Sequence, residues 1–187
     1  DMGWPISHFS DLFLGRPRIG TTKPASSEGG IPVVRVGEIG SLRVRLDRCA
    51  RVELSDKEFE KCKVERGDIL LARAIGSQEQ LGKASLIESL EEPLAFDSHV
   101  MRVRFNTKFV APVFMYHWLR SSGGRRIFLK ASGKTSVQFN INSKQISSIA
   151  IPLPPKPSQE RFVVFAAELE NLSARYRQSL TDLWLRF

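Results

Sequence analysis

Cysteine is scarce in this sequence, and no long apolar run is present. The two cysteines, Cys49 and Cys62, are too far apart for a Cys-x-x-Cys motif, and no nearby histidine completes a zinc site. We therefore expect reduced thiols and not a disulfide framework. No segment approaches the roughly 18 apolar residues that span a bilayer, and the first residues lack the basic and apolar regions of a signal peptide. These absences predict a cytoplasmic protein with no membrane partner.

Motifs of catalysis are also missing. The sequence has no Gly-x-x-x-x-Gly-Lys-Ser/Thr phosphate loop, no Gly-x-Ser-x-Gly elbow, no His-Glu-x-x-His pair and no Asn/Asp-Pro-Pro-Tyr/Phe signature of amino-methyltransferases. The nearest acidic cluster joins Asp47 to Glu58 and Glu60, and we interpret it as a solvated face and not as a magnesium site. His99 and His117 lack metal-ligand spacing. We therefore predict no catalytic residue, no metal site and no cofactor.

Positive charge is concentrated in one part of the chain. The sequence carries 28 Lys+Arg and 20 Asp+Glu, a net charge of +8. Residues 158–187 hold 4 of each sign, so the remaining 24 cations and 16 anions, and with them the whole excess, belong to residues 1–157. A basic excess confined to one domain is typical of a nucleic-acid binder, although charge alone also fits ribosome-associated proteins or a merely solvated surface.

Short strands and helices alternate in residues 1–157, which predicts a single globular domain of the mixed α/β (α+β) class. Ser55 followed by Glu58 is a capping box that opens a helix ending near Cys62. Apolar residues at helical spacing on both sides of Gly123 and Gly124 predict two short helices between 111 and 129. The other expected elements are a helix over 7–14, a basic loop over 15–30, a hairpin of strands 31–39 and 42–46 that turns at Gly40-Ser41, and strands over 69–73, 83–87, 100–105, 137–141 and 146–153.

The last thirty residues predict a long coiled-coil-type helix, which we treat as a second domain over 158–187. Apolar residues follow one another at steps of three and four, with one extra step of four that would locally unwind a supercoil. Prolines at 152, 154, 155 and 157 should hold the entry extended, so we expect the helix to project from the body and not to fold back over it. The predicted helix-partner interface comprises Phe162, Phe165, Leu169, Leu172, Tyr176, Leu180 and Leu183, with Phe187 at the end of the seam.

Five segments, taken in order along nearly the whole chain, carry a resemblance to a known family. They are Gly15-Arg16-Pro17-Arg18; Gly30-Ile31-Pro32-Val33-Val34-Arg35-Val36-Gly37; Gly67-Asp68-Ile69-Leu70-Leu71-Ala72-Arg73; Gly133-Lys134-Thr135-Ser136-Val137-Gln138-Phe139-Asn140-Ile141; and Ile151-Pro152-Leu153-Pro154-Pro155 followed by Ser158-Gln159-Glu160. This ordered set resembles one target recognition domain and one conserved helical region of a specificity subunit from type I restriction-modification systems. The family usually has Glu-Gln where this chain has Ser158-Gln159-Glu160, a difference that changes the helix cap but not the layout.

The resemblance implies a non-catalytic subunit that binds one half of a bipartite duplex DNA target. Methyltransferase subunits and a restriction subunit would be its partners, and these would perform adenine methylation, DNA translocation and cleavage. A complete specificity subunit carries two recognition-domain and helix units, whereas this chain has one. We therefore expect either half of a longer subunit or a half-length protein that forms a homodimer through its helix.

Candidate DNA-binding residues are polar or cationic side chains in the segments above. Arg16 and Arg18 flank Pro17 and suit contacts to phosphate or guanine, against the alternative of a solvated basic turn. A polar stretch beside a predicted strand suits hydrogen bonds to bases or backbone, against the alternative of a hairpin that satisfies its own amides. That stretch comprises Lys134, Thr135, Ser136, Gln138 and Asn140, and Lys83 completes the set of candidates.

Other charged residues leave two interpretations open. Arg35 and Arg73 lie in otherwise apolar segments, where an unpaired charge is costly, so they should either face the DNA or pair with Glu38 or Asp68. Arg102 and Arg104 share one face of a strand that is either positive toward DNA or simply solvated. For Trp118 we expect a role in core packing.

Two rival functions remain. One is a stand-alone nuclease that uses the Glu58–Glu60 region, and the other is an RNA-binding or pure assembly module. The sequence does not reveal which bases would be recognised.

Overall fold

In the computed structural model, which describes residues 3–26, 29–40, 44, 46–134 and 139–184, a four-stranded antiparallel sheet forms the centre of a globular head. The strand order is β2 (Arg18–Ile19), β9 (Val100–Val103), β5 (Ile69–Ala72) and β7 (Ala84–Leu86). Every residue of β5 is buried, because the sheet is covered on both faces. This burial explains why β5 is continuously apolar and does not alternate with polar residues.

The two faces of the central sheet contribute to two separate hydrophobic cores. Ile69 and Leu71 point into the larger core, where Phe9, Phe105 and Phe128 are also buried. Helices cover this face, namely α1 (Phe9–Leu12), α3 (Pro112–Arg120), α4 (Ser122–Ala131) and α5 (Ser143–Ser147).

Leu70, between Ile69 and Leu71, points into the smaller core instead. There it meets a second sheet of order β4 (Ala50–Val52), β3 (Ile31–Val34) and β8 (Ala95–Phe96), in which β3 and β8 run parallel. Helix α2 (Asp56–Cys62) flanks this sheet. Successive residues of β5 therefore point into different cores, and this one strand joins the helical layer to the second sheet.

Short strand pairs close the edges of the head. Strand β1 (Ile6–His8) pairs with β12 (Ala150–Pro152), so the beginning of the described chain lies beside the segment that leads into the last helix. A three-stranded sheet joins β10 (Gly133–Lys134), β11 (Phe139–Asn140) and β6 (Ala74–Ile75). Two single turns of 3-10 helix span Val36–Glu38 and Leu46–Arg48.

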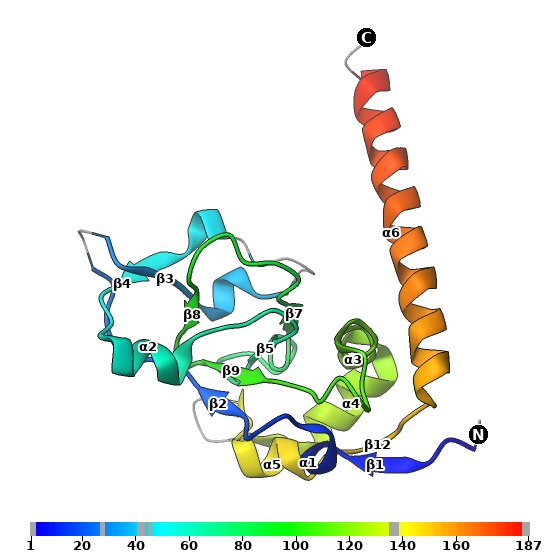
Figure 1. Ribbon diagram of the computed structural model, residues 1–187, viewed down its shortest axis with the longest axis horizontal. Helices are drawn as coiled ribbons and strands as arrows, with labels where there is room; N and C mark the ends of the chain where they lie inside the picture. Colours follow the sequence, from blue (N-terminus) through cyan, green and yellow to red (C-terminus); the bar gives the residue numbers. More distant parts are fainter. Residues whose placement is uncertain (1–2, 27–28, 41–43, 45, 135–138, 185–187) are drawn as a thin grey trace.

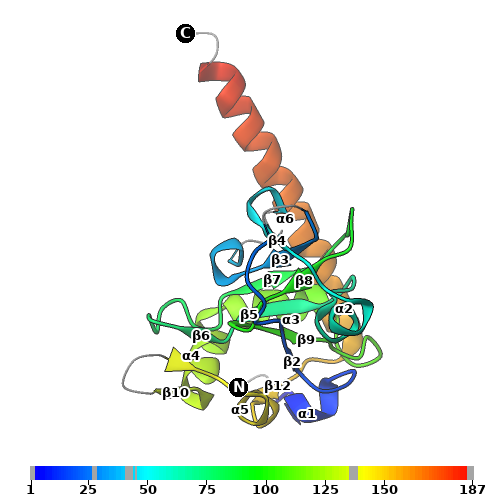
Figure 2. The same cartoon turned by 90° about the vertical axis from the view of Figure 1, so that its left-hand side faces the viewer.

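Helix α6 (Lys156–Trp184) leaves the head and projects away from it (Figure 1, Figure 2). Its root is fixed by Gln159, which is fully buried: Oε1 accepts a bond from the Ala111 amide at 2.9 Å, and Nε2 donates to the carbonyls of Phe109 at 3.0 Å and Pro154 at 2.9 Å. No described helix is long and apolar enough to cross a membrane.

Much of the predicted architecture is confirmed. The mixed α/β head, the buried strand β5, the two helices α3 and α4 and the projecting helix α6 are all present. The capping box of α2 forms as expected, since the Glu58 carboxylate accepts bonds from both the amide and the hydroxyl of Ser55.

Other expectations need correction. The 7–14 segment divides into β1 and α1, and the basic loop contains the strand β2, which needs β9 as its partner. The segment 146–153 begins as the end of α5 and becomes strand only at Ala150. Pro157 lies in the first turn of α6 and not in the extended entry, because a proline without an amide hydrogen is tolerated there.

The predicted hairpin at Gly40-Ser41 falls largely on positions 41–43 and 45, outside the described residues. The antiparallel neighbour of β3 is β4.

Candidate nucleic-acid interface

Arg16 and Arg18 are exposed at the edge of the central sheet. Between them, Pro17 is buried and holds the backbone against the head, so the two arginine side chains lie on a fixed segment. Arg18 belongs to β2, the edge strand, opposite Arg102 of β9. This position keeps two cations at the surface on a segment braced by the core.

The start of α5 lies beside this pair. The Ser143 hydroxyl donates a long bond, 3.5 Å, to the Pro17 carbonyl, and β2 and α5 lie near one another at the same end of the head (Figure 1, Figure 2). Lys144 is exposed there. Analysis of the sequence missed this element, although Asn142 and Gln145 form a capping box, in which the Asn142 side chain accepts a bond from the Gln145 amide at 2.9 Å.

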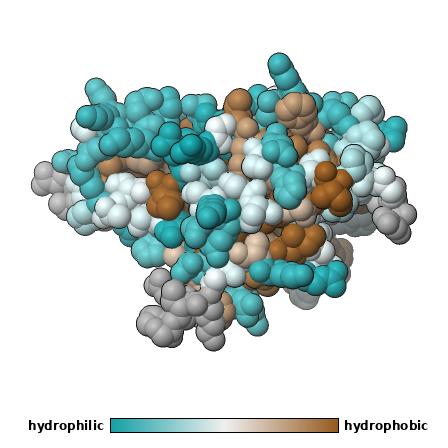
Figure 3. All heavy atoms as spheres, turned by 90° about the horizontal axis from the view of Figure 1, so that it is seen from below, coloured by the Kyte–Doolittle hydropathy of each residue, from teal (hydrophilic) through white to brown (hydrophobic). Residues whose placement is uncertain are grey.

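The surface seen from below is mostly hydrophilic, with a few separate hydrophobic patches (Figure 3). Such a surface is polar, as protein–DNA interfaces are.

Arg73 serves as a brace for the same region. Its guanidinium donates to the Ser98 carbonyl at 2.8 Å and weakly to the Ile141 carbonyl at 3.4 Å. These bonds fasten the end of β11 to the turn before β9. Of the two alternatives left open for Arg73, the ion pair with Glu38 or Asp68 is wrong, because the guanidinium donates to backbone carbonyls, and contact with DNA stays a prediction.

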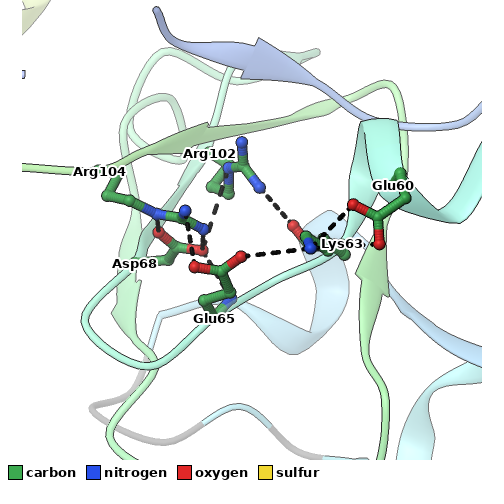
Figure 4. A network of polar contacts seen from close by, with 6 residues as sticks. All are labelled: Glu60, Lys63, Glu65, Asp68, Arg102 and Arg104. Atoms are coloured by element: carbon green, nitrogen blue, oxygen red, sulfur yellow. Dashed lines mark hydrogen bonds and ion pairs between the residues drawn. The ribbon is translucent and has the colours of Figure 1, made fainter. Parts of the chain in front are cut away.

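Asp68 instead pairs with Arg102 of β9 and with Arg104, which follows β9 (Figure 4). The Asp68 carboxylate is fully buried and accepts bonds from Arg104 Nε at 2.6 Å and Nη2 at 2.9 Å, and from the Glu65 amide at 2.7 Å. Arg102 Nε lies 4.0 Å from the same carboxylate, and its Nη1 donates to the Lys63 carbonyl.

This network neutralises much of the charge that Arg102 and Arg104 would otherwise present at the surface. Hydrogen bonding to Asp68 raises the pKa of Arg104, whereas burial lowers the pKa of Arg102. Glu65 adds a second carboxylate at 2.7 Å from Arg104. The interpretation of a simply solvated face is wrong, because the Arg102 and Arg104 side chains are only 13% and 24% exposed and lie against a buried acid, and contact of this face with DNA stays a prediction.

The remaining candidates for DNA binding, Arg35, Lys83 and Asn140, are all half-buried. Arg35 is half-buried, and its amide, not its guanidinium, donates to Glu38 Oε2 at 2.8 Å. Lys83 is half-buried and lines a groove of about 230 Å³ with Arg120 and Arg125. Asn140 is half-buried in β11, where it pairs with Gly133.

Most of the polar stretch next to β10 lies outside the described residues. This holds for Thr135, Ser136 and Gln138 and for the side chain of Lys134. Their DNA-binding role stays a prediction.

The acidic and thiol groups have structural surroundings. Glu58 caps α2 and pairs with Lys23 at 2.9 Å, and these bonds, chiefly with Ser55, lower its pKa to about 2. The described residues contain no cluster of three or more His, Cys, Asp or Glu that could hold a metal ion. Neither Cys49 nor Cys62 forms a disulfide, and burial raises the pKa of Cys49 to about 11. Trp118 packs against the larger core, as predicted.

Comparison with known proteins identifies the family. The family model described as "Type I restriction modification DNA specificity domain" matches residues 2–181. The chain belongs to this family. It is a DNA specificity domain, a non-catalytic component of type I restriction-modification systems.

Curated relatives agree with this assignment. The chain is 25% identical to a putative type I restriction enzyme MjaX specificity subunit of Methanocaldococcus jannaschii over 90% of its own length and 40% of the relative. It is 28% identical to the EcoKI specificity subunit of Escherichia coli K12 over 76% of its own length and 31% of the relative. The specificity domain thus spans less than half of each relative.

Solved structures share the fold. The HsdS subunit from Thermoanaerobacter tengcongensis aligns over 95% of this chain and 44% of its own, with a TM-score of 0.63 at 19% identity. A chain from a study of complex assembly in the type I R-M system aligns over 96% of this chain and 41% of its own, with a TM-score of 0.67 at 15% identity.

Proposed function

We propose that the head binds duplex DNA at one half of a bipartite target, and that it does so through the surface around β2 and the start of α5. The observation that carries the proposal is the contrast among the arginines. Arg73, Arg102 and Arg104 are bonded inside the head, while Arg16 and Arg18 are exposed on a braced edge. Two exposed guanidinium groups on a braced backbone segment are suited to phosphate or to the bidentate recognition of guanine.

Affinity and sequence choice would come from different groups. Lysines and arginines that neutralise phosphates supply binding that weakens with salt, because condensed counterions are released. Polar side chains that reach base edges supply discrimination. In this division Arg16, Arg18 and Lys144 contribute position and affinity, and the stretch 134–140 contributes contacts to bases.

Helix α6 would join two recognition units. We propose a functional division near residue 157, with the head as the DNA-binding part and the helix pairing antiparallel with a second helix. That helix belongs either to a second unit of a longer chain or to a second copy of this one. The six seam residues from Phe165 to Leu183 are each 47–65% exposed, which supports a missing partner.

Methyltransferase and restriction subunits would be the partners of the assembled pair, which we place in the cytoplasm with the chromosome. This part of the proposal depends on the family to which the chain belongs, since the relatives are specificity subunits of type I restriction enzymes.

A selection from random duplexes tests the proposal. Duplex DNA retained by the purified chain should share a short sequence, and excess RNA should not compete for it. The Arg16→Ala/Arg18→Ala variant should lose about tenfold or more in affinity, whereas Arg175→Ala, which removes an exposed cation from α6, should bind like the wild type. Equal binding of RNA and DNA, or equal loss in both variants, would refute the assignment.

A further inference from the structure

The groove of about 230 Å³ at the β7 edge of the head brings three cations together. They come from three parts of the chain: Lys83 precedes β7, Arg120 ends α3, and Arg125 belongs to α4. Arg120 is exposed and the other two are half-buried, so none of the three is closed off from solvent. Glu79, which is exposed, also lines the groove. Positive charge is therefore in excess there.

Gly40 holds two of these cations close to each other. Arg120 Nη1 donates to the Gly40 carbonyl at 2.6 Å. A Cβ on Gly40 would lie 3.4 Å from Lys83 Cδ and 3.9 Å from Lys83 Nζ, so the lysine lies against the place of the missing side chain. The φ of Gly40 is 127°, a conformation that favours glycine. Lys83 and Arg120 thus meet beside one backbone position.

The positive charge of the groove is not balanced inside the head. Among the residues that the structure describes, the ion pairs to carboxylates are made by other lysines and arginines. Arg125 donates to the carbonyls of Leu81 and Glu79. A guanidinium has five N–H donors and an ammonium three, so donors remain for a ligand. Burial lowers the pKa of Arg125, because its charged form loses hydration. An anion in the groove would offset this cost.

The groove and Arg18 lie at opposite edges of the central sheet. One row of paired residues crosses the four strands, namely Ile19, Met101, Leu71 and Ala84. Neighbouring strands are about 4.8 Å apart, so the backbones of β2 and β7 are separated by roughly 14 Å. The major groove of duplex DNA is about 12 Å wide. The two groups of cations are therefore close enough for one duplex.

Both groups also border the same end of the sheet. Ile19 is the last residue of β2 and Ala84 the first of β7, and at this end β5 leads into β6. Strand β6 pairs with β11, which is followed by α5, where the Ser143 hydroxyl bonds the Pro17 carbonyl. The contacts of β11 thus connect the groove with the segment that carries Arg18.

We propose that this groove binds a backbone phosphate of the same duplex that Arg16 and Arg18 contact. Guanidinium groups bind phosphate through charge-assisted hydrogen bonds, and lysine adds a compact point charge. Small-molecule sites usually measure roughly 300–1,000 Å³, so the smaller size of this groove suits one anionic group. The contact would add affinity and fix the duplex on the head without reading its bases.

This phosphate site rests on the proposed DNA binding of the head, and a charge reversal in the groove tests it separately. Lys83→Glu places a carboxylate beside Arg120 and Arg125, so it fills the site without leaving the arginines unpaired. Lys83→Ala removes the charge and adds none, as a second variant. The matched control is Lys108→Glu, which reverses an exposed cation after β9, toward the opposite end of the sheet.

Duplex binding is measured from about 50 to 200 mM salt, with the urea midpoint of each variant. Lys83→Glu should raise the Kd about tenfold or more and lower the slope of log Kd against log salt by about 1, at an undiminished urea midpoint. Lys83→Ala should act in the same direction, and Lys108→Glu should leave the slope unchanged. The loss should be equal for a selected and a random duplex, because phosphate contacts carry no sequence information.

Uncharged methylphosphonate linkages locate the contact on the duplex. One position should weaken binding by the wild type and have no effect on Lys83→Glu, because both changes remove the same interaction. The positions that depend on Arg16 and Arg18 should be different ones.

Tight duplex binding by the wild type, with both Lys83 variants binding like Lys108→Glu, would refute the phosphate site and leave the proposed function intact. Calorimetric binding of inorganic phosphate that Lys83→Glu abolishes, with duplex binding unchanged, would show a site for free phosphate and equally refute the DNA contact. A wild-type chain that binds no duplex would refute the proposed function together with this site. Losses in the Lys83 variants but none in Arg16→Ala/Arg18→Ala would support the groove and refute the surface around β2.

Discussion

The head and helix α6 differ in how far their apolar and charged residues are buried. In the head, most large apolar side chains of the described residues are packed into two cores, and the buried acid Asp68 is bonded to Arg104. On α6, the seam residues are half exposed, and beyond its root the helix has only Ala166 buried. The described part of the head thus buries most of its apolar surface, whereas the helix exposes an apolar face.

The residues that stabilise the fold of this chain are therefore different from those that it exposes for assembly. Interactions that stabilise the head are internal, and they leave Arg16 and Arg18 exposed at its edge. Interactions that α6 can make lie mostly outside the chain, so they should be sensitive to concentration and to the identity of the partner.

The largest expected effect falls on the helix. Replacing Leu169 and Leu172 by Asp places charges on the seam and should abolish dimerisation, because a symmetric pair loses four buried leucines at roughly 1.5–3 kcal/mol each. Sedimentation should show only monomer, while the thermal midpoint of the head stays unchanged. A dimer of undiminished stability would contradict the role given to the seam.

The next largest effect is a loss of folding stability in the head when its buried ion pair is broken. Asp68→Ala removes the buried carboxylate that Arg104 bonds and leaves Arg104 with the exposed Glu65, and breaking a buried pair costs about 3–5 kcal/mol. Urea denaturation measures this loss. The matched control is Glu60→Ala, which removes an exposed partner of Lys63 and should cost less than about 1 kcal/mol. Similar costs for the two variants would show that burial of the network is unimportant.

A smaller effect is expected at the junction between the head and α6, where Gln159 makes its hydrogen bonds. Gln159→Ala removes two hydrogen bonds that join α6 to the segment before α3 and a third to the Pro154 carbonyl, and leaves buried backbone groups unsatisfied at a cost of about 1–3 kcal/mol. Hydrogen exchange should accelerate in the first turn of α6 more than in β5. Unchanged exchange at the root would mean that packing alone holds the helix.

The smallest effect concerns pH. The pKa of Glu58 is lowered from 4.5 to about 2 in the folded chain, so its stabilising contribution is present above about pH 4.5 and is lost as pH falls toward 2. The urea midpoint of the wild type should therefore fall more between pH 5 and pH 3 than that of Glu58→Gln. Parallel curves would exclude Glu58 as the source.

Local patterns in the sequence were sufficient for some elements. The capping box of α2 lies within four neighbouring residues, and the apolar run of β5 reports burial directly. The exposed seam of α6 follows from its repeat of threes and fours. Each of these signals depends on residues that are close in the chain.

Other features depend on contacts that no local pattern contains. Arg104 bonds Asp68, which is 36 positions away in the sequence, and Arg73 bonds the carbonyl of Ile141, which is 68 positions away. Strand β2 has only two residues and exists because β9 lies beside it. Helix α5, in contrast, has a local signal in its Asn142–Gln145 capping box, which the interpretation of the sequence missed.

The salt dependence of binding to duplex DNA tests the central claim most directly. We predict that log Kd rises linearly with log salt, with a slope of about 0.9 for each phosphate neutralised, and that Arg16→Ala/Arg18→Ala lowers the slope by about 2. An affinity that does not change between about 50 and 200 mM salt would contradict the assignment of the head as a DNA-binding domain.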